Sequence, residues 1–145
     1  MEQIAETTSY EQEKTPVKRR VVLIIDDSPD MLRLVRTILE MEDYEVFTSP
    51  SGSDALLVLA KIVQPDLILL DMQMEDMSGP DFLLLLEGKR PDLLEAVPVV
   101  FLTAMDQVPS TKAMGHIRKP FDFDKFLETV HDYIVVGVKR STQKH

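Results

Sequence analysis

The chain has 145 residues, of which 44% are hydrophobic, and its 16 Lys and Arg stand against 25 Asp and Glu, for a net charge of −9. This length and composition favour one globular domain, and the acidic balance disfavours direct nucleic-acid binding because the phosphate backbone would repel the main body. The absence of cysteine excludes a disulfide framework, a thiolate zinc site and a cysteine nucleophile.

Both ends of the chain are expected to be tails. Residues 1–18 are polar, free of glycine and without clear periodicity, so we predict a flexible tail there, a domain over residues 19–139 and a C-terminal tail over residues 140–145. Basic residues near both ends are interpreted as solubilising flanks. The polar start is neither a secretory signal nor a transit peptide, and no apolar run has the length of a membrane span, which predicts a cytoplasmic protein without membrane contact.

The first part of the folded region alternates between strand and helix patterns. Val21–Ile25 is a short β-branched apolar run, typical of a strand buried on both faces. An Asp-Asp pair ends it, and Ser28 with Pro29 supplies the N-cap and first residue of a helix. Apolar residues then recur at i, i+3, i+4 and i+7, which places Met31, Leu34, Val35 and Ile38 on one face of that helix. Residues 45–48 predict a second strand.

The same alternation continues to the end of the domain. A second helix begins near Ser51 or Ser53 and ends at Pro65, with one face formed by Leu56, Leu59, Ala60 and Val63. The later elements are a third strand over residues 67–70, a helix through residues 82–86, a fourth strand over residues 97–102 and a brief fifth strand over residues 116–118. A last amphipathic helix is marked by Phe123, Phe126, Leu127 and Val130.

Strands that alternate with helices indicate a parallel sheet covered on both faces. With right-handed crossovers, this order predicts an α/β fold with a doubly wound, five-stranded parallel sheet and helices on both faces. In such a sheet the functional crevice lies at the carboxyl ends of the strands. The residues that follow each strand are therefore the candidates for chemistry.

Charged and polar residues follow four of the predicted strands. The first strand is followed by Asp26 and Asp27, the third by Asp71, the fourth by Thr103 and the fifth by Lys119. Three carboxylates at one edge repel one another and need a compensating cation, for which oxygen ligands favour Mg²⁺. A carboxylate can accept a phosphoryl group, whose charge the metal and Lys119 can neutralise while Thr103 donates a hydrogen bond. Asp71 is then the natural nucleophile.

Four short motifs stand at these strand ends. They are Asp-Asp after the first strand, Asp-Met-Gln-Met after the third, Phe-Leu-Thr-Ala on the fourth and Lys-Pro-Phe after the fifth. Each motif alone has little specificity, but their joint order and spacing over about residues 20–138 resembles the response-regulator receiver family of two-component signalling. The resemblance implies the flavodoxin-like receiver fold and a phosphoacceptor signalling domain rather than an enzyme that acts on a separate substrate.

The resemblance also implies a metal site and a phosphoryl acceptor. Asp26, Asp27 and Asp71 would hold Mg²⁺ together with the backbone carbonyl of Gln73. Asp71 would accept the phosphoryl group from a histidine of a sensor histidine kinase or of a histidine phosphotransfer protein.

A switch is implied as well. Thr103 would move toward the phosphoryl group, Lys119 would pair with it, and Pro120 would follow a cis peptide bond. The family's switch aromatic, three residues before the lysine, is replaced by His116. Histidine is polar and titrates near neutrality, so either the switch is altered or pH-tuned, or His116 is a surface residue on an edge strand.

The segment between Thr103 and Lys119 departs most from the family. It is shorter than usual by more than one helical turn, and it contains Pro109 and Gly115. We therefore expect the helix between the fourth and fifth strands to be short or missing. Because the family's usual dimer and output face lies there, we predict that this protein does not dimerise in the usual way.

Three further positions depart from the pattern near the acceptor. Glu75 stands where the family commonly has proline, which we expect to loosen the loop after Asp71. Gln73 and Met105 occupy two positions that tune dephosphorylation in the family. Met105 cannot orient an attacking water, so we predict a long-lived phosphoryl group.

Two helices carry unbroken apolar runs, residues 56–60 and 82–86. Five consecutive apolar residues go all the way round a helix, so one or two should face outward unless they are covered. The two interpretations are thicker internal packing and a partner or homodimer surface on a non-standard face.

The expected function is that of a stand-alone response regulator, because no output domain fits after residue 138 and the output must then be a protein contact or onward phosphotransfer. One alternative is a pseudo-receiver, a binding module whose shortened segment no longer switches. The other is a magnesium-dependent aspartyl phosphatase, which normally needs a second acid where this chain has Gln73 and a cap that no insertion here is long enough to form.

Overall fold

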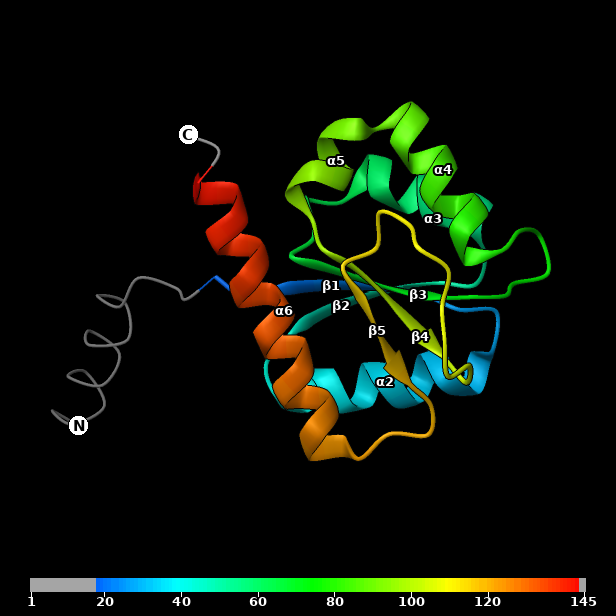
Figure 1. Ribbon diagram of the computed structural model, residues 1–145. Helices are drawn as coiled ribbons and strands as arrows, with labels where there is room; N and C mark the ends of the chain where they lie inside the picture. Colours follow the sequence, from blue (N-terminus) through cyan, green and yellow to red (C-terminus); the bar gives the residue numbers. More distant parts are fainter. Residues whose placement is uncertain (1–17, 144–145) are drawn as a thin grey trace, which may run out of the picture.

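The computed structural model describes residues 18–143, and the predicted tail residues 1–17 and residues 144–145 lie outside the described part. The strands are β1 (Val21–Ile25), β2 (Glu45–Ser49), β3 (Leu67–Asp71), β4 (Val99–Thr103) and β5 (Gly115–Arg118). The helices are α2 (Pro29–Met41), α3 (Gly52–Lys61), α4 (Gly79–Lys89), α5 (Pro91–Ala96) and α6 (Phe123–Gln143), arranged as in Figure 1.

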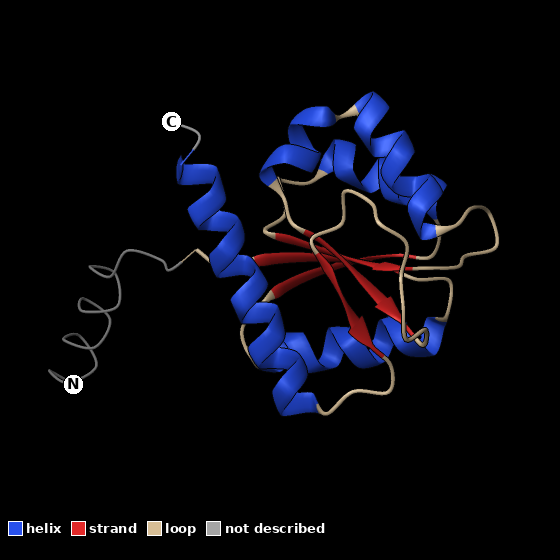
Figure 2. Cartoon of the chain, in the orientation of Figure 1, coloured by secondary structure: helices blue, strands red, loops and turns tan. Residues whose placement is uncertain are grey.

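The strands form one parallel sheet in the order β2-β1-β3-β4-β5. Helices α2 and α6 cover one face, whereas α3, α4 and α5 cover the other (Figure 2). This arrangement confirms the predicted doubly wound fold. Since all strands point the same way, their carboxyl ends meet at one edge of the sheet.

Each face of the sheet has its own apolar core, because successive side chains of a strand point to opposite faces. In β1, Leu23 and Ile25 belong to the core beneath α3 and α4, and Val22 and Ile24 to the core beneath α2 and α6. All four side chains are fully buried. Burial on both faces explains why the central strands appear in the sequence as unbroken apolar runs.

Three helices begin with a serine cap close to the carboxyl end of a strand. The hydroxyls of Ser28, Ser51 and Ser78 each accept a hydrogen bond from a backbone N–H three residues onward, at 3.2, 3.0 and 3.1 Å. Each cap satisfies an N–H that has no partner inside the helix and so determines where the helix begins. The caps therefore fix the point at which each strand-to-helix loop enters its helix.

No helix lies between β4 and β5 in this structure, where residues 104–114 are irregular. The predicted loss of that helix is confirmed. Helix α5 was not predicted, because it has six residues and its start, Arg90-Pro91-Asp92, has the composition of a turn. Helix α6 continues to Gln143, past residue 139 where we placed the end of the domain. None of the described helices is long and apolar enough to cross a membrane.

The helix faces were predicted only in part. On α3 the buried residues are Gly52, Ala55 and Leu59, whereas Ala60, which we placed on the buried face, is exposed. Val63, which we placed on the same face, is exposed and lies beyond Lys61, where the helix ends. Leu34 and Phe123 are also exposed, at 40% and 52%. A helix that is apolar on every side does not indicate which side meets the sheet, and this explains the error on α3.

The apolar runs of α3 and α4 place leucines in solvent, as predicted. Leu57 is 62% exposed and Leu84 is 66% exposed. Leu84 also lines a groove of about 520 Å³ between α4 and residues 109–112 of the segment that replaces the missing helix. Each of the two helices therefore exposes a leucine that its fold does not bury.

Helix α4 begins in close contact with the end of β3. A Cβ atom added to Gly79 would lie 2.6 Å from the backbone oxygen of Asp71 and 2.9 Å from the ring of Phe101. A Cβ atom on Gly88, at the other end of the helix, would meet nothing within 4 Å. Only the absence of a side chain at Gly79 lets the helix start this close to Asp71.

Candidate functional site

Three carboxylates converge where β1 and β3 end side by side. Asp26, Asp27 and Asp71 each offer an oxygen, and these oxygens all lie within 4.8 Å of one another. Asp26 is 2% exposed and the side chain of Asp71 is 14% exposed, so two of the carboxylates are largely removed from water. The structure thus brings together the three acids that the sequence placed at this edge.

Lys119 supplies the cation that faces this cluster. Its Nζ lies 3.1 Å from Oδ2 of Asp26 and 3.7 Å from Oδ1 of Asp71. The backbone N–H of Lys119 donates to the carbonyl of Thr103 at 2.7 Å, which ties the residue after β5 to the end of β4. The Lys119–Pro120 peptide bond is cis, as the resemblance implied.

The other hydrogen bonds of the acids come from backbone groups. The N–H of Ser28 donates to Oδ1 of Asp26 at 2.9 Å, and the N–H of Glu75 donates to Oδ2 of Asp27 at 3.0 Å. Asp71 is bonded by the N–H of Gln73. We expected Glu75 to loosen this loop, but its backbone N–H instead bonds the loop to the acidic cluster.

Burial, and after it the charge of Asp26, raise the pKa of Asp71 to about 6 against the opposing effect of Lys119. The ionised form of Asp71 is therefore costly in the absence of another cation. Three ionised carboxylates against one ammonium leave two negative charges, which match a divalent ion. The donors are all oxygen, and this chemistry fits Mg²⁺.

Thr103 and His116 occupy different surroundings. Thr103 is 2% exposed, and its Oγ1 accepts the N–H of Met105 at 3.0 Å. His116 is exposed and pairs in register with Phe101, which belongs to the core on the α3 and α4 side. With no helix between β4 and β5, this part of the edge strand stays open to solvent. The structure places Thr103 at the same sheet edge as the acids and His116 on the open surface.

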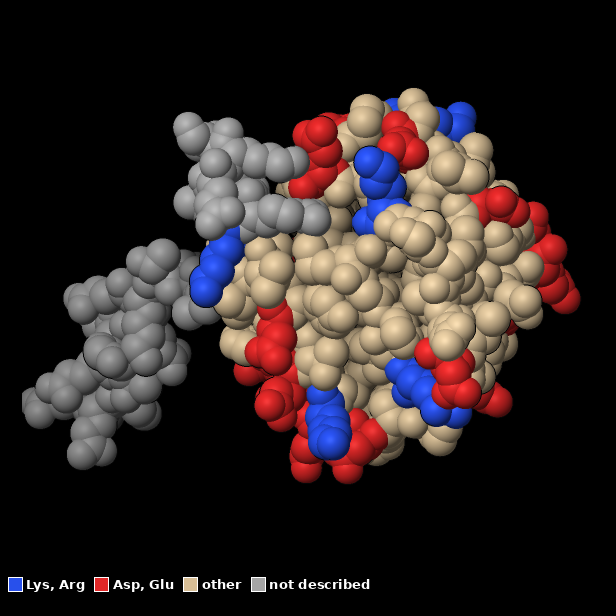
Figure 3. All heavy atoms as spheres, viewed as in Figure 1, with Lys and Arg blue, Asp and Glu red and all other residues tan. Residues whose placement is uncertain are grey.

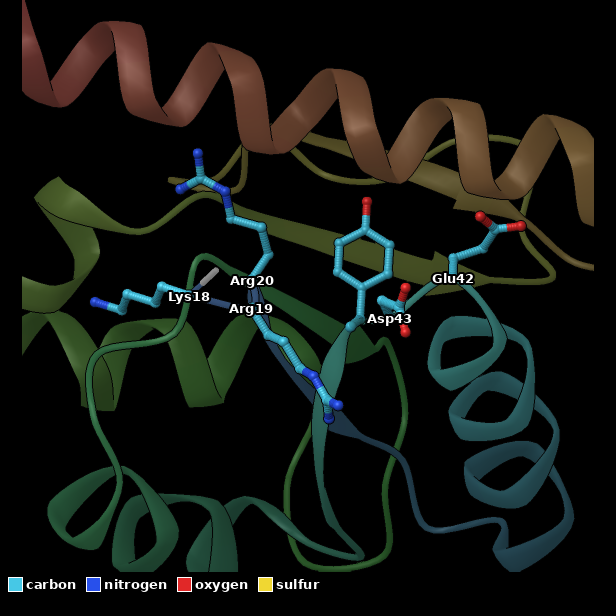
Figure 4. Close-up of a pocket in the computed structure, with 6 residues that line it drawn as sticks. Lys18, Arg19, Arg20, Glu42 and Asp43 are labelled. Atoms are coloured by element: carbon cyan, nitrogen blue, oxygen red, sulfur yellow. The ribbon is translucent and has the colours of Figure 1, made fainter. Parts of the chain in front are cut away.

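A second hollow lies at the opposite, amino end of β1 and β2. It has a volume of about 430 Å³ and is lined by Lys18, Arg19, Arg20, Glu42, Asp43 and Tyr44 (Figure 4). Its lining carries both positive and negative side chains, and Arg20 is also paired with Asp66 at 3.4 Å.

Figure 3 shows that Lys and Arg occur in separate spots beside Asp and Glu on the face it displays, around a broad uncharged area. These features leave the acidic cluster as the candidate site.

The doubly wound sheet and the acid and lysine cluster at its carboxyl edge define a receiver-type α/β signalling domain. The model of the response regulator receiver domain matches residues 22–131, and the chain belongs to this family. Sporulation initiation phosphotransferase F of Bacillus subtilis is 32% identical over 120 residues, which cover 78% of this chain and 92% of that protein. The polar-differentiation response regulator DivK of Brucella abortus is 31% identical over 119 residues, which cover 78% of this chain and 94% of that protein.

Longer relatives and solved structures agree with this assignment. The transcriptional regulatory protein KdpE of Mycobacterium tuberculosis is 36% identical over 128 residues, covering 84% of this chain but 52% of that protein, so the chain spans about half its length. Chemotaxis protein CheY4 of Vibrio cholerae superposes with a TM-score of 0.71 at 28% identity, covering 80% of this chain and 99% of that one. Response regulator TrrA of Thermotoga maritima, solved in complex with Mg(2+)-BeF, gives 0.67 at 28% identity, covering 79% of this chain and 98% of that one.

Proposed function

We propose that this receiver domain accepts a phosphoryl group on Asp71 from a phosphohistidine donor, in a magnesium-dependent reaction, and signals through protein contacts. The observation that carries the proposal is the convergence of three carboxylates with Lys119 at the carboxyl edge of the sheet. The donor would be a sensor histidine kinase or a histidine phosphotransfer protein, and a cytoplasmic setting follows from such a partner.

The metal would be held by Asp26, Asp27, Asp71 and the backbone carbonyl of Gln73. The all-oxygen donor set and the two uncompensated negative charges support this assignment, as does the magnesium complex of TrrA. When bound, Mg²⁺ would neutralise charge on the phosphoryl oxygens.

The transfer needs little covalent chemistry from the rest of the site. A carboxylate oxygen of Asp71 attacks phosphorus, an O–P bond forms, and the P–N bond to the donor imidazole breaks, so that imidazole leaves with the bonding electron pair. Lys119, already 3.7 Å from Asp71, neutralises the negative charge on the transferred group. Thr103 donates its hydroxyl to a phosphoryl oxygen after its bond with the N–H of Met105 opens.

The response then passes to the segment after β4. Moving the hydroxyl of Thr103 releases residue 105, and residues 104–114 lead directly to the groove beside α4. The exposed leucines of α3 and α4, Leu57 and Leu84, offer the apolar surface for a downstream protein or for a homodimer through a non-standard face.

A pseudo-receiver is the second candidate. The observation in its favour is the irregular segment 104–114, together with the exposure of His116 where the family has its switch aromatic. Such a domain would keep the fold and the binding surface, but its conformation would not respond to phosphorylation.

One experiment separates the two candidates. The full chain is incubated with Mg²⁺ and acetyl phosphate, and its intact mass is compared with that of Asp71→Asn. We expect a gain of one phosphoryl group in the wild type and none in the variant or without Mg²⁺. No gain with acetyl phosphate or with a histidine-phosphorylated donor protein would favour the pseudo-receiver.

A further inference from the structure

The loop between β3 and α4 is closed at its base by its own backbone. The N–H of Gly79 donates to the carbonyl of Met72 at 2.7 Å, and the N–H of Met74 donates to the carbonyl of Met77 at 3.2 Å. These bonds place Glu75 and Asp76 at the tip of a narrow loop, where both are exposed.

One bond from the tip reaches the acidic cluster. The N–H of Glu75 donates to Oδ2 of Asp27 at 3.0 Å and restricts rotation of that carboxylate. Proline has no N–H and could not make this bond, so the bond depends on the residue with which this chain departs from the family's common proline. The orientation of Asp27 is therefore coupled to the position of the loop tip.

A second set of bonds holds the tip from the other side. The carboxylate of Asp76 accepts the N–H of Gly52 at 3.2 Å, the N–H of Ser53 at 2.9 Å and the hydroxyl of Ser53 at 2.9 Å. Gly52 and Ser53 are the first two residues of α3, whose N–H groups have no partner within the helix and whose dipole favours an anion. The hydrogen bonds from Ser53 hold the pKa of Asp76 below its usual value.

A close packing contact joins the same two elements. A Cβ atom added to Gly52 would lie 2.5 Å from Sδ of Met77, so the absence of a side chain lets Met77 approach the start of α3. The loop is thus fastened to α3 by charge-assisted hydrogen bonds at Asp76 and by packing at Met77.

We propose that Asp76 is a positioning residue for the metal site of this domain, a role that rests on the function proposed above. Its bonds to the start of α3 hold the loop tip in place, and the loop tip holds the N–H of Glu75 against Asp27. Gln73, which precedes the tip in the same loop, is kept at the acidic cluster by the same bonds. A ligand oriented before the metal arrives binds it more tightly than a ligand that must first be ordered.

The test measures Mg²⁺ affinity of the full chain by following backbone amide NMR shifts during a titration with MgCl₂. We expect Asp76→Ala to weaken Mg²⁺ binding about tenfold, at the lower end of what the loss of an outer-shell partner costs. In the metal-free protein, hydrogen exchange at the Glu75 amide should accelerate in the same variant. If Asp76→Ala does not fold, Asp76→Asn serves instead, with a smaller loss, because it keeps an acceptor oxygen but not the charge.

Two control variants separate positioning from stability and charge. Ser51→Ala removes a capping bond at the same helix start, to the N–H of Asp54 at 3.0 Å, without touching the loop. Asp81→Ala removes an exposed carboxylate from the first turn of α4. Both should stay within about twofold of wild-type Mg²⁺ affinity, the range of an ordinary surface substitution.

Three outcomes would count against the proposal. Equal Mg²⁺ affinities for Asp76→Ala and Ser51→Ala, in a protein that binds Mg²⁺ and is phosphorylated, would overturn the positioning role alone. Unchanged hydrogen exchange at the Glu75 amide in Asp76→Ala would show that the bonds of Asp76 to α3 do not hold the bond between Glu75 and Asp27. A wild type with no response to Mg²⁺ would overturn the metal site itself, and with it the proposed function.

Discussion

Two loops leave the same edge of the sheet and differ in how they are held. The β3–α4 loop, residues 72–78, is bonded to Asp27 on one side and to the start of α3 on the other. The β4–β5 segment, residues 104–114, has no helix, and its ion pairs, Lys112 with Glu87 and Asp106 with Arg118, lie on the surface. Exposed pairs of this kind contribute little stability.

The difference assigns separate tasks to the two loops. The proposed chemistry at Asp71 would require metal ligands that stay in place, and the tethered loop is the one that would hold them. A response to the proposed phosphorylation would require a segment with few constraints, and the bond between Thr103 and the N–H of Met105 connects the end of β4 to such a segment. The following predictions test whether the tasks are divided in this way.

The largest effect is expected from Lys119→Ala. The initial rate of phosphorylation by acetyl phosphate should fall about 100-fold, because the charge that develops on the phosphoryl group loses a preorganised cation. Arg118→Ala, which removes a neighbouring cation paired with Asp106 on the surface, should leave the rate nearly unchanged. Similar losses of phosphorylation rate in both variants would contradict the assignment of the chemistry to the acidic cluster and not to the β4–β5 segment.

The next effect concerns stability and pH. Since the pKa of Asp71 is raised to about 6, the folded metal-free protein binds a proton that the unfolded chain releases near pH 4, and stability falls as pH rises between these values. Asp71→Asn should therefore raise the free energy of unfolding at pH 7.5 by about 1–2 kcal/mol, after allowance for solvent screening. The gain should vanish near pH 4, as measured by urea unfolding in EDTA at the two pH values. A gain that is independent of pH would show that the charge of Asp71 is not its cause.

A smaller effect is expected on the lifetime of the phosphoryl group. Met105 is 46% exposed and cannot orient a water molecule, so the phosphorylated protein should keep its label for minutes. Met105→Asn should shorten the half-life severalfold, whereas Ala substitution of the exposed Gln107 in the same segment should not. Loss of label from the wild type within seconds would contradict this prediction.

The smallest effect on folding is expected at the exposed leucines. Leu57→Glu and Leu84→Glu should change the free energy of unfolding by no more than about 0.5 kcal/mol, as for other surface substitutions. If these leucines form the output surface, both variants should nonetheless weaken self-association of the phosphorylated protein, measured by light scattering, and its binding to a partner protein. Unchanged association in both variants would contradict the proposal that these leucines form the output surface.

The sequence predicted the strands and the acidic cluster for a physical reason. A strand buried on both faces must be apolar along its whole length, and parallel strands bring the residues at their ends together. Asp26, Asp71 and Lys119 were therefore located from the order of the strands alone, and the structure places them within ion-pair distance.

Contacts that depend on tertiary geometry could not be predicted in this way. The bonds between Asp76 and Ser53 join a loop tip to a helix distant in the sequence, and no periodic pattern signals them. Glu75 was judged by its side chain, whereas its backbone N–H makes the contact. Helix α5 was missed because six residues are too few to show a helical period.

The two glycines at the ends of α4 should differ sharply in their tolerance to mutation. In a library that replaces each position with every amino acid, folded variants should retain glycine at Gly79, where any side chain would meet the backbone of Asp71. Position 88 should accept most residues, since nothing lies near it. The backbone of Asp71 thus prevents substitution at the start of α4, whereas the far end of the helix can vary in sequence.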